Sequence, residues 1–104
     1  MEHVQEIGDR KEEGIIYRVT GNAYLQLRDV QSALSHLEQS TAILRELSQE
    51  FDLGTTLYDC ARALKESGQI SEARERLLEA LALFERLQLP QEQAKVQAAL
   101  DQMN

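Results

Sequence analysis

The sequence repeats itself with a period of 40 residues. Small and large apolar residues recur at this interval in six identical pairs: Gly14/Gly54, Ala23/Ala63, Ala33/Ala73, Leu37/Leu77, Ala42/Ala82 and Leu47/Leu87. Within each copy the apolar positions recur every three or four residues, which is the spacing of one face of a helix. A fixed period of this length at helical spacing is typical of proteins built from stacked helices. We therefore predict an all-α fold.

Gly8 and Asp9 predict a break near the start of the chain. Asp9, with Glu12 three residues later, matches the capping box that begins a helix. The helix that follows should run over about residues 10–27. Its apolar stripe has helical spacing and consists of Ile16, Val19, Thr20, Ala23, Tyr24 and Leu27.

Turn signals divide the rest of the chain, giving about five helices in all. Asp29 is expected to cap a second helix, Gly68 to end a third in a left-handed conformation, and Pro90 to open a fifth. The turns are short, so neighbouring helices should be antiparallel. The predicted units are residues 1–8, the tail of a preceding repeat; 9–48, a first repeat; 49–89, a second repeat; and 90–104, a capping helix.

Each copy resembles the tetratricopeptide repeat. Residues 17–24 with 33–37, and again 57–64 with 73–77, are similar to the family pattern W-x2-L-G-x2-Y followed by A-x3-F. The period of 40 instead of 34, and the missing helix-ending proline, resemble the extended subclass of the family. The resemblance implies a right-handed solenoid of antiparallel helical hairpins. It also implies a non-catalytic scaffold or adaptor module, a C-terminal part of a larger signalling or regulatory protein.

The resemblance further implies a concave groove lined by the first helix of each hairpin. By register, its peptide-binding residues are Arg18, Asn22, Leu25, Tyr58, Arg62, Lys65 and Lys95. Four of these are among only eleven basic residues, in a chain of net charge −7. Such a groove favours an acidic peptide or a free C-terminal carboxylate. The alternative is that these side chains are ordinary solvated charges.

Composition argues against several other functions. The acidic net charge disfavours nucleic acid and anionic membranes as partners. No apolar run approaches the length of a membrane span, and no signal-peptide pattern is present, so a cytoplasmic location is the default expectation. One cysteine and two isolated histidines predict no metal site, and the sequence has no catalytic or cofactor-binding motif. We expect neither an enzyme nor a cofactor.

The first residues of the chain resemble the end of a repeat. Val4 and Ile7 align, by the 40-residue period, with Leu44 and Leu47. Their packing partners would lie in a preceding hairpin. Two explanations follow: the chain is the end of a longer array, which we favour, or it self-associates through Val4 and Ile7. In the second case the chain is a homodimer and acts as a structural or oligomerisation segment.

Overall fold

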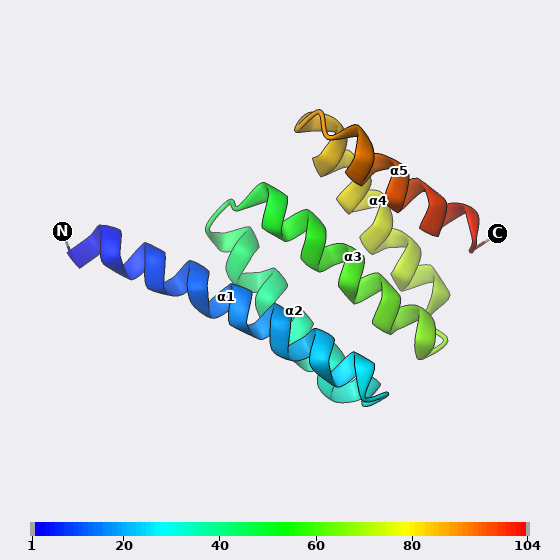
Figure 1. Cartoon of the computed structure of the whole chain (residues 1–104), viewed down its shortest axis with the longest axis horizontal. Helices are drawn as coiled ribbons and strands as arrows, with labels where there is room; N and C mark the ends of the chain where they lie inside the picture. The colour runs from blue at the N-terminus through cyan, green and yellow to red at the C-terminus, as the bar shows by residue number, and fades with distance from the viewer. Residues whose placement is uncertain (1, 104) are drawn as a thin grey trace.

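The computed structural model describes residues 2–103, with side chains from Gly8 onward, and these residues form five helices and no strand (Figure 1). The helices are α1 (Glu2–Gln26), α2 (Val30–Glu46), α3 (Glu50–Glu66), α4 (Ile70–Arg86) and α5 (Pro90–Asp101). The all-α fold of helical hairpins predicted from the sequence period is confirmed.

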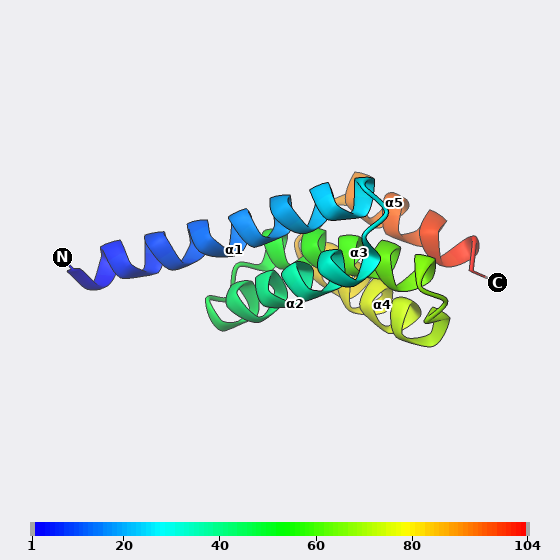
Figure 2. The same ribbon diagram turned by 90° about the horizontal axis from the view of Figure 1, so that it is seen from below.

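The helices lie in two layers. α1, α3 and α5 form one layer, and α2 and α4 form the other (Figure 2). Each helix packs against the next along the chain, and α1 also contacts α3. α1 and α5 therefore lie at opposite edges of the upper layer, with α3 between them (Figure 1).

The predicted break at Gly8 and Asp9 is wrong, because α1 continues through both residues as one helix of 25 residues. A glycine inside a helix costs only about 1 kcal/mol relative to alanine, and the residues around Gly8 are mostly good helix formers. Asp9 and Glu12 therefore lie within the helix instead of capping its start. The assignment of residues 1–8 to a preceding repeat stays a prediction.

All four turns have the same backbone conformation. Arg28, Ser48, Gly68 and Gln88, spaced 20 residues apart, have φ values of 66°, 55°, 83° and 58°. After each of them the next amide bonds back to a carbonyl five residues earlier, as Gln69 N does to Leu64 O at 2.8 Å. This is the Schellman ending of a helix. The left-handed stop predicted at Gly68 is confirmed, and three non-glycine residues adopt it as well.

The predicted starts of the later helices are also confirmed. The Asp29 carboxylate accepts a hydrogen bond from the backbone N–H of Ser32 at 3.2 Å, so Asp29 caps α2. Pro90 occupies the first turn of α5, where its missing N–H costs nothing.

Glycines at the hairpin contacts let the two layers approach closely. A Cβ placed on Gly21 of α1 would lie 2.7 Å from Leu37 Cγ of α2, and one on Gly54 of α3 would lie 2.7 Å from Phe84 Cζ of α4. The side chains of Leu37 and Phe84 fill this space and are buried. The core is therefore formed between the layers, and one surface of α1, α3 and α5 is left free.

The apolar stripe predicted for residues 10–27 lies partly outside the core. Ile16, Val19 and Leu27 are 57%, 58% and 75% exposed. The buried side of α1 instead passes through Gly14, Gly21 and Leu25. The reason is that α1 is an edge helix, with a neighbour on only some of its sides.

Candidate peptide-binding groove

The predicted groove residues lie in the layer of α1, α3 and α5. Arg18, Asn22 and Leu25 are on α1, Tyr58, Arg62 and Lys65 are on α3, and Lys95 is on α5. In each helix they follow one another at intervals of three, four or seven residues, which keeps them on one face. Their binding role stays a prediction, but their geometry can be described.

An open cavity of about 570 Å³ separates the ends of α1 and α3. Its lining residues are Leu25, Gln26, Arg28, Arg62, Lys65 and Glu66. Arg28 Nη1 donates to Glu66 Oε1 at 2.8 Å across this cavity, and the Arg28 side chain is 82% exposed. Beside that ion pair, Arg62 and Lys65 leave the cavity with an excess of positive charge.

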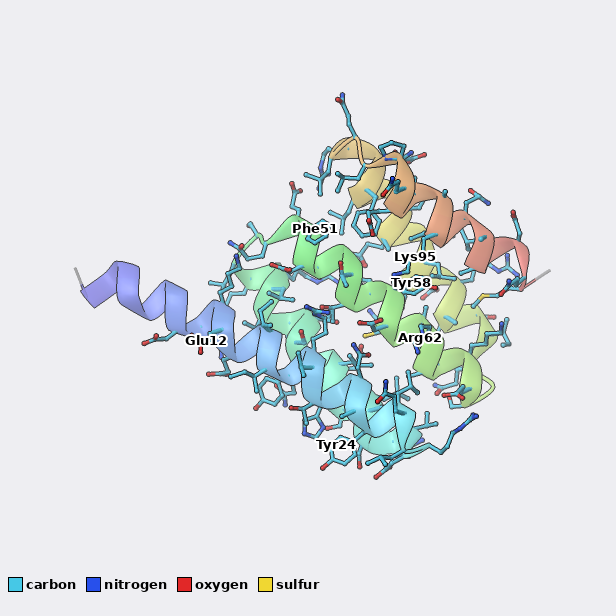
Figure 3. The ribbon with its side chains drawn as sticks, in the orientation of Figure 1. Glu12, Tyr24, Phe51, Tyr58, Arg62 and Lys95 are labelled. Carbon is cyan, nitrogen blue, oxygen red and sulfur yellow. The ribbon has the colours of Figure 1, made fainter. Side chains whose placement is uncertain are left out.

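A smaller cavity of about 110 Å³ lies between α3 and α5. Its lining residues are Tyr58, Ala61, Arg62, Lys65, Leu77, Ala99, Gln102 and Met103. Arg62 and Lys65 line both cavities, so they form the boundary between the two. Lys95 does not line this cavity, but its Nζ lies 4.6 Å from the centroid of the Tyr58 ring, a cation–π contact that joins α5 to α3 (Figure 3).

Asp59 connects two of the predicted groove residues. Asn22 Nδ2 donates to Asp59 Oδ2 at 3.0 Å, and Arg62 Nη1 donates to Asp59 Oδ1 at 3.3 Å. The Asp59 side chain is only 7% exposed, whereas that of Arg62 is 51% exposed. The carboxylate therefore holds one terminal nitrogen of the Arg62 guanidinium, and about half of the Arg62 side chain stays exposed.

Arg18 lines neither cavity. It is half-buried, and its Nε and the Oδ1 of Asn22 are buried atoms without a hydrogen-bond partner in the described structure. The structure thus brings Leu25, Tyr58, Arg62 and Lys65 to the cavities, whereas Arg18, Asn22 and Lys95 line neither of them.

Sequence reasoning missed the part that Arg28 and Asp59 play in this surface. Arg28 stands two residues after the end of α1 and lines the larger cavity. Asp59 aligns by the period with the apolar Val19, and an acid at an inward position is a signal for a buried ion pair.

Cys60 is a buried thiol. Burial raises the pKa of Cys60 to about 12, so the thiol stays neutral at physiological pH. Its Sγ lies 3.4 Å from Thr41 Oγ1 in the contact between α2 and α3.

No group of three or more His, Cys, Asp or Glu side chains among the described residues is arranged to hold a metal ion. None of the helices in residues 2–103 combines the length and hydrophobicity needed to span a bilayer.

Comparison with known protein families gives a match. The model of the family described as tetratricopeptide repeat matches residues 21–86, which is more than half of the chain. This stretch begins in α1 and contains α2, α3 and α4 completely. Comparisons with curated proteins and with solved structures gave no match.

Proposed function

Since the chain belongs to the tetratricopeptide repeat family, we propose that it is a non-catalytic interaction module that binds a peptide segment in the groove of α1, α3 and α5. The family supports a protein or peptide as the partner. The groove residues support the narrower proposal that this peptide is acidic or presents a free carboxylate.

The position of Arg62 and Lys65 carries the proposal. Both side chains line the two cavities, so a peptide that lies across α3 passes them whichever cavity it enters first. A guanidinium has five N–H donors, and the bond to Asp59 uses one of them. The remaining donors can bind a carboxylate in the bidentate geometry that arginine favours.

The surroundings of Arg62 prepare it for binding. Asp59 holds the guanidinium at Nη1, so less side-chain freedom is lost when a ligand binds. Leu25 and Tyr58 add apolar surface on either side, where the side chains of a peptide can pack. The groove thus combines a charged centre with apolar flanks, which is the usual composition of a peptide site.

The test measures the binding of short fluorescent acidic peptides by anisotropy. Replacing Arg62→Gln and Lys65→Gln together should weaken binding at least about tenfold at low salt, because charge-assisted hydrogen bonds contribute about 1.5–3 kcal/mol each. The matched control, Arg76→Gln with Arg86→Gln, removes the same charge from α4 in the other layer. It should leave binding unchanged.

Two comparisons sharpen the result. An amidated peptide compared with its free-acid form separates recognition of the terminal carboxylate from recognition of acidic side chains. A basic peptide of equal length should bind more weakly than the acidic one. Equal binding of both peptides, or an equal loss in the control variant, would contradict the proposal.

A further inference from the structure

One side of α1 is apolar and has no neighbour. Ile16 and Val19 are 57% and 58% exposed, whereas Thr56 and Asp59, the residues 40 positions later in α3, are 0% and 5% exposed. α3 is covered on this side because α2 packs there, with the Ser40 and Thr56 hydroxyl oxygens 3.5 Å apart. No described helix covers the equivalent side of α1 (Figure 2). This side of α1 therefore has the character of a contact surface.

The centre of this side is a stripe that we call the α1 surface, formed by Ile16, Thr20, Ala23 and Leu27. These residues follow one another at intervals of four, three and four, so they lie on one line. Leu27 comes directly after the end of α1, and its N–H bonds to Ala23 O at 3.1 Å, which continues the helical turn. The sizes of the four residues run large, small, small, large, and the pattern is the same in either direction. Such a stripe is complementary to itself when two copies run antiparallel.

In an antiparallel pair, Ile16 of one chain would lie against Leu27 of the other, and Thr20 against Ala23. The small central residues would let the two helices approach closely, as glycines do at the hairpin contacts inside the chain. The large residues would then enclose the centre from both ends. A parallel pair would instead place large residues against each other and small against small.

Charge at the two ends of the stripe also favours the antiparallel arrangement. Asp9, Glu12 and Glu13 precede the stripe and, together with Ile16 and Tyr17, line an open cavity of about 450 Å³. At the other end stands Arg28, whose side chain is 82% exposed and pairs with Glu66 at 2.8 Å. Antiparallel pairing keeps the acidic ends of the two copies apart, whereas parallel pairing sets Asp9, Glu12 and Glu13 of both copies side by side.

We propose that a second copy of this chain covers the α1 surface, forming a two-fold dimer with antiparallel α1 helices. The four residues of the α1 surface line neither groove cavity, so substitutions in them test the dimer separately from peptide binding. Val4 and Ile7, predicted earlier as self-association residues, lie outside the residues whose side chains are described, and the dimer does not depend on them.

Sedimentation velocity over a wide range of protein concentrations tests the dimer. The wild-type chain should pass from monomer to dimer as concentration rises. Ile16→Glu with Leu27→Glu should raise the dimer dissociation constant at least about 100-fold, because each substitution acts twice in a two-fold interface. The helical circular dichroism should be unchanged, since both side chains are exposed in the monomer.

The matched control is Leu78→Glu, which places the same charge on an apolar residue of α4 that is 51% exposed. It should dimerise like the wild type. Peptide binding should survive in the Ile16→Glu, Leu27→Glu chain, so a failure of the dimer and a failure of the groove would be told apart.

Cysteine cross-linking tests the direction of the helices. A mixture of Thr20→Cys chains with Ala23→Cys chains should form a disulfide-linked pair faster than either variant alone, because residue 20 faces residue 23 across the two-fold axis. Cys60 is buried and does not compete. The proposal would be overturned by a wild-type chain that stays monomeric, or by a dimer that is insensitive to Ile16→Glu with Leu27→Glu. It would also be overturned if each single cysteine variant cross-linked as fast as the mixture.

Discussion

Gly54→Ala tests how closely the layers are packed. The substitution adds one methyl group at the point where α3 meets α4. That Cβ would lie 2.7 Å from Phe84 Cζ and 2.8 Å from Phe84 Cε1. Phe84 is 2% exposed, and its ring lies 6.1 Å from the ring of Phe51, so it has little room to move away.

The expected loss is the difference between two opposing effects. Alanine is favoured over glycine inside a helix by about 1 kcal/mol. Non-bonded carbons pack at about 3.5–4.0 Å, so the ring or the helix must shift by about 1 Å. Overpacking of this kind costs about 1–3 kcal/mol. If the overpacking cost lies in the upper part of that range, subtracting the helix-propensity gain leaves a net loss of about 1–2 kcal/mol in the free energy of unfolding. Tm should then fall by about 5–10 °C.

Urea unfolding followed by circular dichroism measures this loss, with protein concentration held fixed because self-association would add stability. Gly8→Ala is the matched control, since no atom lies within 4 Å of a Cβ at that position. It should gain up to about 1 kcal/mol from helix propensity alone.

A double-mutant cycle identifies the cause. In a Phe84→Leu background the rigid ring is gone, so Gly54→Ala should cost at least about 1 kcal/mol less than it does in the wild type. If Gly54→Ala stabilises the protein, or costs the same in both backgrounds, the close contact between α3 and α4 does not limit packing.

Two further predictions concern the turns and the buried thiol. Ser48→Gly and Gln88→Gly should each raise the free energy of unfolding by about 1 kcal/mol, because non-glycine residues are strained in the left-handed conformation that Gly68 adopts freely; equal or lower stability in urea unfolding would refute this. Cys60 should react with a thiol reagent at pH 8 only after urea is added. Its stabilising contribution should be complete below its unfolded pKa of 9.0 and decline as pH rises toward about 12, and a Cys60→Ala variant should lack that part of the decline. Rapid labelling of the folded chain would contradict the burial of the thiol.

The sequence period was sufficient to predict the helical hairpins, since apolar spacing and turn residues agree with one another over most of the chain. Asp29, Gly68 and Pro90 marked helix boundaries because each has a specific backbone or capping role. The break predicted at Gly8 was wrong because a single glycine, in a segment of good helix formers, is too weak a signal to end a helix.

Other features had no local signal at all. Nothing in the side chains of Ser48 and Gln88 predicts a left-handed turn, and only their 20-residue spacing from Gly68 connects the three. Register placed Asn22 and Arg62 on the first helices of their hairpins, and the structure has them on α1 and α3. Register could not show that both bind Asp59, because this depends on rotamers set by the packing of α1 against α3.

The turns of the backbone recur with half the period of the sequence. Left-handed residues recur every 20 positions, so each step of the chain is one helix and one turn, whereas the apolar pattern recurs every 40. Successive steps alternate between the layer of α1, α3 and α5 and the layer of α2 and α4. An array of this kind can therefore gain or lose two steps and keep every later helix in its own layer. A change of one step would move all later helices into the opposite layer, and the surface formed by α1, α3 and α5 would end there.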